Sequence, residues 1–357
     1  MKINDKYDLL SMNFEELSAF VKSIGEPAFR AKQIAAWLPL GTPVSEMTNL
    51  SKALRDKLEG ATLQTLPKVE RKLVSKIDGT IKYLFSLYDG ECVESVFMRY
   101  KHGNTLCISS QVGCRMGCRF CASTIAGKVR DLLPSELLGQ IIAAQKDTGE
   151  RVSNIVMMGI GEPLDNYNNV IRFLELVNRD DGLNIGYRHI SLSTCGVVPR
   201  IMELAEKEMP ITLSISLHAA NDTARSSIMP VNNKWNINAL LSACEYYYSR
   251  TGRRISFEYT LISGKNDSIK DADELADLLI GAFRKSGAPI HVNLIRVNEV
   301  TETGFKEGTT ESANKFAAHL EGRGITATVR RRLGADIDAA CGQLRRSATK
   351  TVKEENT

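Results

Sequence analysis

The sequence lacks a long hydrophobic run. No apolar stretch approaches the roughly 20 residues needed to cross a bilayer, and the first residues, MKINDKYDLL, hold no basic segment followed by an apolar one. We therefore expect a soluble, cytoplasmic protein without a membrane partner. The chain also lacks a strong excess of either charge, since its net charge is +4 over 357 residues. This excess is compatible with a nucleic-acid partner but does not indicate one.

Cysteine is scarce as well, and it is unevenly distributed. Of the eight cysteines, three lie within CRMGCRFC, at residues 114–121. In a reducing compartment so few cysteines do not suggest a disulfide framework, and a tight cluster favours metal binding or catalysis. The other five are Cys92, Cys107, Cys195, Cys244 and Cys341.

The cluster has no fourth ligand nearby. Cys114, Cys118 and Cys121 follow the spacing C-x3-C-x2-C, in a loop directly after a predicted strand. Zinc normally takes four ligands, with a second cysteine pair further on, and the sequence has no such pair. An iron–sulfur cubane held by three thiolates leaves one iron open, where a small molecule can bind. A zinc site, or buried structural cysteines, is the alternative interpretation, and its function would be that of a non-catalytic, zinc-dependent RNA-binding module.

Two different patterns occupy the first 100 residues. Residues 11 to about 60 have apolar side chains at helical spacing and predict a small helical unit. From about 70 to 100 the apolar period is two, and Asp-Gly pairs at 78–79 and 89–90 separate the segments. Because Asp-Gly between alternating segments is a strong hairpin signal, we predict a three-stranded antiparallel meander.

After residue 104, apolar strand-like runs alternate with helical segments. Six such repeats predict parallel strands with crossover helices, arranged as an open doubly wound α/β sheet or as a barrel, and ITATVRR is a seventh strand candidate. In either architecture, functional sites gather at the carboxyl ends of the strands. The six predicted strands are TLCISS, NIVMMGI, HISLSTC, ITLSISL, ISFEYTL and HVNLIRV.

Polar residues follow several of these strands. The turn MGIGEPLDN contains Gly161, where a backbone can approach a ligand closely, and Glu162, a possible acceptor for an ammonium group. Later strand ends offer groups suited to holding a nucleoside or bonding an adenine edge, although a lone histidine is more often a core residue. These groups are Ser193, Ser216, His218 and Asn298.

The spacing and position of the cysteines resemble the radical S-adenosylmethionine (SAM) superfamily. The resemblance implies a [4Fe-4S] cluster on Cys114, Cys118 and Cys121, whose open iron chelates SAM through its amino and carboxylate groups. It implies that the strand-end residues above, together with Leu217, bind SAM. It also implies an α/β fold, a partial (β/α)6 barrel. The divisions we expect are an N-terminal helical RNA-binding domain (1–65), the β-meander extension (66–103), the barrel core with a C-terminal cysteine loop (104–345) and a disordered tail (346–357).

Four stretches narrow the resemblance to one family. TLCISSQVGCRMGCRFCAST, VMMGIGEPLDN, SISLHAAN and GADIDAACGQLR are together similar to the RlmN family of dual-specificity RNA methyltransferases. The family methylates C2 of adenine in 23S rRNA and in tRNA. Related phenicol-resistance enzymes methylate C8 of the same ribosomal adenine, but they resemble QCGC and GEAL where this chain has QVGC and GEPL. The resemblance therefore favours C2.

The family mechanism assigns three further residues. One SAM methylates a cysteine, by position Cys341, and a second yields a 5′-deoxyadenosyl radical that removes hydrogen from this methyl group. The methylene radical then adds to C2 and joins protein to RNA. Glu94 matches the family's proton acceptor, and Cys107 matches the thiol that releases the product as a disulfide forms with Cys341. From pattern alone Glu94 would face solvent and Cys107 would belong to the core. The remaining cysteines are interpreted as small interior side chains: Cys92, Cys195 and Cys244.

The partners implied are 23S rRNA, tRNA and an electron donor such as flavodoxin or ferredoxin, with the protein a monomer. Basic residues that would hold phosphates occur in several places, although any one such run is more often a solvated face. They are Arg30 and Lys32, RYKH at 99–102, RRR at 330–332, and the arginine pair at 345–346.

Overall fold

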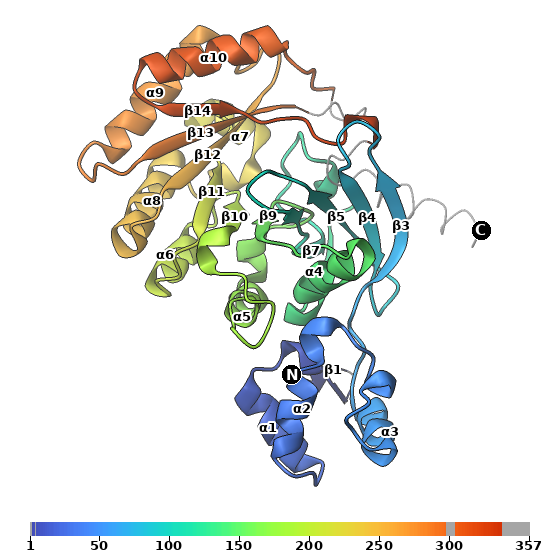
Figure 1. The fold of residues 1–357 in the computed structure, drawn as a ribbon. Coiled ribbons are helices and arrows are strands. Elements are labelled where there is room, and N and C mark those ends of the chain that lie inside the picture. The colour runs from blue at the N-terminus through green and yellow to red at the C-terminus, as the bar shows by residue number, and fades with distance from the viewer. Residues whose placement is uncertain (1, 4, 298–303, 338–357) are drawn as a thin grey trace.

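The computed structural model describes residues 2–3, 5–297 and 304–337. The chain begins with a small helical unit, dark blue in Figure 1, whose core contains Phe20, Ile34 and Leu58. Its first helix starts at a capping box, in which Asn13 and Glu16 each accept the other's backbone N–H. The elements of this unit are β1 (Lys2–Ile3), β2 (Lys6–Tyr7), α1 (Phe14–Ser23), α2 (Phe29–Ala35) and α3 (Lys52–Ala61).

The predicted meander follows and is confirmed. Its strands pair antiparallel in chain order, and the turns lie at the two Asp-Gly pairs. Gly79 and Gly90 have φ of 72° and 85°, a region that glycine enters without strain. The strands are β3 (Lys68–Val74), β4 (Ile81–Ser86) and β5 (Cys92–Met98).

The meander is not a separate sheet, because β5 pairs antiparallel with the first strand of the parallel part. The result is one ten-stranded sheet in the order β14-β13-β12-β11-β10-β9-β6-β5-β4-β3, open at β14 and β3. This arrangement agrees with the α/β expectation and a partial barrel. The parallel strands are β6 (Thr105–Cys107), β9 (Asn154–Met157), β10 (Ile190–Thr194), β11 (Thr212–Ser216), β12 (Ile255–Leu261), β13 (Ile290–Arg296) and β14 (Thr326–Val329).

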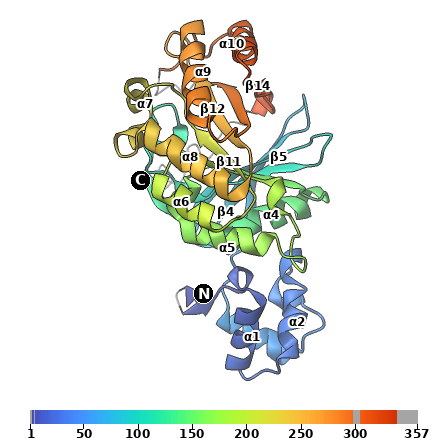
Figure 2. The ribbon, with the colours of Figure 1, turned by 90° about the vertical axis from the view of Figure 1, so that its left-hand side faces the viewer.

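Helices cover one face of the sheet. Figure 2 shows α5, α6 and α8 in front of the strands, and their buried apolar residues join those of the strands in one large core. The helices are α4 (Pro134–Thr148), α5 (Tyr167–Val177), α6 (Val198–Glu206), α7 (Asp222–Ile228), α8 (Ile237–Thr251), α9 (Ile269–Phe283) and α10 (Thr310–Gly322).

The opposite face, here called the inner face, carries polar side chains. Residues directly paired across neighbouring strands point to the same face of a sheet. The pairs Cys107↔Val156 and Val156↔Ser191 place Cys107 in one row with Ser191. Further along the sheet, Ser216 pairs with Glu258 in the same way. The strand-end residues predicted to form a site therefore share this inner face or the loops above it.

Several elements were not anticipated by the pattern of the sequence. A two-stranded ribbon of β7 (Gln111–Gly113) and β8 (Lys128–Asp131) brackets the cysteine loop. The helices α7 and α10 were not predicted either. With seven residues, α7 is too short to show a helical period, and α10 has a weak apolar pattern because it buries only Ala313, Phe316 and Leu320.

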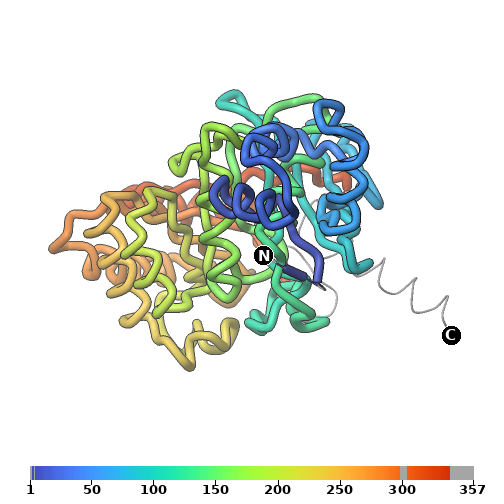
Figure 3. The backbone as a smooth tube through the Cα atoms, turned by 90° about the horizontal axis from the view of Figure 1, so that it is seen from below, coloured from blue at the N-terminus to red at the C-terminus, as the bar shows by residue number. Residues whose placement is uncertain are grey.

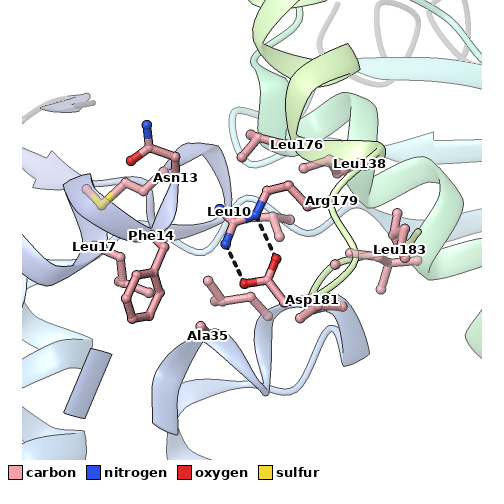
Figure 4. A pocket seen from close by; sticks show the side chains of 15 residues that line it. Leu10, Asn13, Phe14, Leu17, Ala35, Leu138, Leu176, Arg179, Asp181 and Leu183 are labelled. Carbon is pink, nitrogen blue, oxygen red and sulfur yellow. Dashed lines mark hydrogen bonds and ion pairs between the residues drawn. The ribbon is translucent and has the colours of Figure 1, made fainter. Parts of the chain in front are cut away.

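The N-terminal unit is attached to the core by buried hydrogen bonds. Asp8 accepts bonds from Ser11 and from Ser135, at the start of α4, at 2.5 and 2.7 Å. Figure 1 shows the unit below the core, and Figure 3, seen from below, shows it in front of segments drawn in green. An apolar cleft of about 480 Å³ lies between the two parts, and Arg179 and Asp181 form an ion pair at its side (Figure 4).

Candidate active site

The loop of three cysteines is folded by its own backbone bonds. Cys114 N–H donates to Gly127 O at 3.0 Å, and Cys121 N–H donates to Cys118 O at 3.1 Å. Gly117, between the first two cysteines, has φ of 73°, so the loop turns where a side chain would be strained. Cys114 is buried, and Cys118 and Cys121 are half-buried.

Asp165 joins this loop to the turn after β9. Its carboxylate accepts bonds from Gln111 Nε2 and Lys128 Nζ, both at 2.9 Å, and forms an ion pair with Arg115. Burial raises the pKa of Asp165, but these partners outweigh burial and hold the pKa below its usual value. Asp165 therefore ties both ends of the loop to the strand edge.

The donor set fits an iron–sulfur cluster. Burial raises the pKa of the Cys114 thiol to about 12, and burial raises that of Cys118 as well. A bound cation has the opposite effect and favours the thiolate form of a coordinating cysteine. In the part of the chain that the structure describes, no three His, Cys, Asp or Glu side chains converge as ligands of one metal ion. Cysteine thiolates are the usual ligands of iron–sulfur clusters.

The Gly-x-Gly-Glu turn after β9 packs tightly against the strand end that leads into the cysteine loop. A Cβ at Gly159 would lie 2.6 Å from Ile108 O, and one at Gly161 would lie 2.7 Å from Gln111 N. Glu162 is buried, and its carboxylate accepts the N–H groups of Leu164 and Cys195 at 3.0 and 2.7 Å. Glu162 thus connects this turn to the end of β10, and its bond to a ligand ammonium group stays a prediction.

His218 lies at the end of β11 in a constrained conformation. It has φ of 59°, and its ring packs edge-on to Phe120 of the cysteine loop at 4.9 Å between centroids. Its Nδ1 accepts Thr260 N–H at 2.9 Å, so the neutral ring carries its proton on Nε2. Burial, with help from the charge of Arg225, lowers the pKa of His218 to about 3. His218 is therefore a neutral donor near neutral pH.

Arg225 of α7 binds the carbonyl groups at these strand ends. Its guanidinium, fully buried, donates to the carbonyl oxygens of Cys195, Ser216 and Leu217 at 2.7, 3.0 and 3.1 Å. The backbone N–H groups of Leu217 and His218 donate in turn to Glu258 O. Ser216, Leu217 and His218 are thus fixed beside the cysteine loop. Ser193, half-buried on β10, pairs with Ser214 in the sheet and shares its face.

Glu94 and Cys107 lie together on the inner face of the meander. Cys107 pairs with Val96, two residues beyond Glu94 on β5, so the two side chains point the same way. Both are buried. Glu94 forms an ion pair with Lys82 of β4, with 3.1 Å between Nζ and Oε2. The alternative interpretation of Glu94, as a solvent-facing residue of an alternating strand, is wrong, because the structure encloses its side chain.

Several predictions fall outside the described residues: Asn298, Cys341, the arginine pair at 345–346 and the tail at 346–357. The described chain ends at residue 337, in a segment attached to the β3–β4 hairpin. Asp336 accepts Ser75 Oγ–H and Lys76 N–H at 2.6 and 2.8 Å.

Comparison with known proteins agrees with this architecture. Residues 108–279 match the radical SAM superfamily, and residues 7–63 match the ribosomal RNA large subunit methyltransferase N-terminal domain. Two proteins with the name "Probable dual-specificity RNA methyltransferase RlmN", from Alkaliphilus oremlandii and Clostridium perfringens, are 54% and 53% identical to this chain, over 96% of it and 98% of their own length. The chain belongs to the RlmN family.

A solved structure supports the same assignment. A radical SAM methyltransferase from Sphaerobacter thermophilus superimposes with a TM-score of 0.88 and 41% identity, over 94% of this chain and 98% of that one. As an RlmN-type radical SAM RNA methyltransferase, the chain uses SAM and an iron–sulfur cluster and acts on RNA. No helix among the described residues has the length and apolar character of a membrane span.

Sequence reasoning did not find three residues that support the site in this RlmN family member. Asp165 and Arg225 hold the loops, and Lys82 faces Glu94. Asp165 lies within a turn that was singled out, so its charge was a usable signal. No feature of the sequence indicated a buried role for Arg225 or Lys82, because single basic residues in a helix or an alternating strand are usually solvated.

Proposed function

We propose that this chain methylates C2 of an adenine, in the peptidyl-transferase loop of 23S rRNA and next to the anticodon in tRNA. C2 lies between two ring nitrogens and is electron-poor, so it does not attack the methyl group of a sulfonium directly. Methylation there needs a carbon radical, a proton acceptor and a means of releasing the product. The observation that carries the proposal is the placement of buried Glu94 and Cys107 on the same inner face.

Cys114, Cys118 and Cys121 would hold a [4Fe-4S] cluster. When bound, this cluster supplies the electron that cleaves SAM reductively, after receiving it from a donor such as flavodoxin or ferredoxin. The buried thiols and the loop fixed by Asp165 support this assignment, since together they present a rigid, enclosed donor set.

The residues around the cysteine loop would bind SAM. Nε2–H of His218 is available by tautomer as a donor, and Ser193 and Ser216 offer hydroxyl groups from neighbouring strands. The tight turn at Gly161 allows the backbone to approach a ligand, and Glu162 holds that turn in position. Leu217, fixed by Arg225, and Asn298 complete the set that the family resemblance implies.

Three residues would carry the methyl group and handle the proton. Cys341 accepts a methyl group, which becomes the bridge between protein and RNA. Once the adduct has given one electron back to the cluster, Glu94 would take the proton from C2. The Cys107 thiolate would then attack the sulfur of Cys341, so that an S–S bond forms as the bond from sulfur to the bridging methylene carbon breaks. This carbon would take up the proton held by Glu94 and leave as the methyl group of the base. Cys107 lies beside Val96, Met98 and Val156, in a partly apolar wall that would exclude water from this step.

Nucleoside mass spectrometry tests the proposal. Anaerobically reconstituted protein, reductant, SAM and an RNA fragment with the target adenine should yield 2-methyladenosine, and Cys341→Ala should yield none while its iron content is unchanged. The product 8-methyladenosine would contradict the proposal and place the chain with the phenicol-resistance enzymes. If the protein holds an intact cluster but forms no methylated adenosine, adenine is not its substrate.

A further inference from the structure

The ion pair between Lys82 and Glu94 is unusual in its burial. Lys82 is 1% exposed and Glu94 is 0% exposed, whereas these residue types are almost never fully enclosed without a strong reason. Their strands are neighbours in the meander, and both side chains point to the inner face, since Lys82 pairs with Val96, two residues beyond Glu94. The pair therefore lies in the same wall as Cys107, which also pairs with Val96.

Stability does not account for this pair. The cost of removing two charges from water commonly equals or exceeds their mutual attraction, so apolar residues of similar volume would serve a structural purpose at least as well. The wall beside the pair is indeed apolar, with Val96 and Met98. The retention of both charges is therefore consistent with a role other than stability.

Neutral hydrogen bonds already hold β5 in place. Ser109 Oγ donates to Glu94 O at 2.6 Å, and Ser95 Oγ donates to Gln140 Oε1 at 2.7 Å on the helix-covered face. Gln140 also accepts Ser109 N–H at 2.9 Å. The backbone of Glu94 is thus located without Lys82, whose ammonium group pairs with the carboxylate.

We propose that Lys82 is a positioning residue for proton removal from the adenine. Its ammonium group compensates the negative charge of the enclosed Glu94 carboxylate and fixes Oε2, so that the carboxylate is ready to accept a proton in a site without bulk water. Without this partner, the enclosed carboxylate would lose both the compensating charge and the contact that fixes Oε2. The proposal rests on the proposed function, in which Glu94 takes the C2 proton.

The test compares Lys82→Gln, which keeps a hydrogen-bond donor and removes the charge, with Lys82→Arg, which keeps the charge. We expect Lys82→Gln to release methylated RNA about 100-fold more slowly. Methylation of Cys341, iron content and formation of the covalent protein–RNA species should be preserved, so that this species accumulates on denaturing gels. Lys82→Arg should recover a substantial part of the rate.

An isotope effect separates this role from a structural one. With deuterium at C2 of the target adenine, product release by Lys82→Gln should slow several-fold relative to protium, because proton removal has become limiting. Lys72→Met is the matched control, since Lys72, on β3 of the same hairpin, forms a partly exposed ion pair with Asp147 of α4. It should leave rate and isotope effect at wild-type values. If Lys82→Gln does not fold, the same measurements are made on Lys82→Met, which also removes the charge, and its rate is compared with that of Lys82→Arg.

The outcomes distinguish the two proposals. A wild-type enzyme that makes 2-methyladenosine, with a Lys82→Gln variant that neither accumulates the covalent species nor shows the isotope effect, overturns the role of Lys82 alone. A wild-type enzyme that makes no 2-methyladenosine overturns the proposed function and the role of Lys82 with it.

Discussion

At the scale of single residues, the site depends on a few side chains that contact backbone rather than substrate. Arg225 binds three carbonyl groups, and Glu162 binds two N–H groups, each bridging separate loops. Such contacts orient neighbouring groups before a ligand binds, and they fix backbone segments that have no regular partner. The loops of the site are therefore built as one hydrogen-bonded unit.

Replacing Arg225 by Met should disrupt this unit. Three buried carbonyl groups would lose their donor, and we expect the cluster-free protein to lose about 3 kcal/mol of unfolding free energy in urea. SAM affinity should fall as well, measured by calorimetry on reconstituted protein. Arg225→Lys, which keeps the charge but not the planar set of donors, should recover only part of the loss. Unchanged stability and affinity in Arg225→Met would contradict this assignment.

Gly161→Ala tests the tight turn after β9. The new Cβ would lie 2.6 to 2.8 Å from Gln111 and Ser110, at a φ of 107° that side chains rarely adopt. We expect the turn to move, with a loss of roughly 2 kcal/mol of stability and a marked loss of SAM binding. Gly127→Ala is a useful comparison, since its φ is also positive but no atom lies within 4 Å of the added Cβ. Equal effects of the two substitutions would show that space is not the cause.

At the scale of elements, the β3–β4 hairpin holds the last described segment of the chain. Asp336 accepts bonds from Ser75 and Lys76, and Asp78 accepts Gly334 N–H at 2.9 Å. Burial raises the pKa of Asp78, but hydrogen bonds from the backbone N–H groups of Gly334 and Thr80 outweigh it and hold this pKa at about 2. The Ser75 hydroxyl lowers the pKa of Asp336. Both carboxylates must be ionised for this attachment.

Acid should therefore release the segment at 334–337. A carboxyl group whose pKa is lowered in the attached state stabilises the attachment fully at any pH above its ordinary pKa, near 3.8. This stabilisation is lost as the pH falls toward the lowered pKa, about 2 for Asp78. We expect the Lys76 and Gly334 amides to be protected from hydrogen exchange at pH 6, and this protection, corrected for intrinsic rates, to disappear between about pH 4 and pH 2. Asp336→Asn should weaken protection of Lys76 already at pH 6. Protection that is independent of pH in this range would refute the carboxylate attachment.

The parts of the fold and site that the sequence predicts are those with strong local patterns. Apolar runs such as ISFEYTL predict buried strands, and β12 is buried at every position. The rule that sites gather at strand ends predicts Gly161 and His218 beside the cysteine loop, and both lie there. Lys82 could not be found this way, because its partner is set by the register of β4 against β5, which the pattern alone does not specify.

At the scale of the whole molecule, the helical unit and the barrel core form two parts joined by buried bonds. Asp8 and Ser11 contact Ser135, and Glu16 forms an ion pair with Arg172. A rigid attachment of this kind would let basic residues on the helical unit and the inner face of the sheet engage one RNA together. Arg30, stacked on exposed Phe29, and Lys32 belong to the same helix, α2.

Removing these two charges should weaken RNA binding and make it less dependent on salt concentration. We expect the variant with Arg30→Ala and Lys32→Ala to bind RNA less tightly, with a slope of log affinity against log salt reduced by about 1.5. Filter binding at several salt concentrations measures this slope. Replacing Arg284 and Lys285, just after α9, by Ala is the control and should leave the slope unchanged. A slope that is unaffected by the α2 changes would exclude phosphate contacts there.

The most direct test of the central claim follows the methyl group through the protein. The enzyme is first incubated with SAM labelled with ¹³C in its methyl group, freed of that SAM, and then given RNA, reductant and unlabelled SAM for a single turnover. If Cys341 carries the methyl group to the RNA, the first 2-methyladenosine formed contains ¹³C, and Cys341→Ala forms none. A first product that carries the unlabelled methyl group would contradict transfer through the protein.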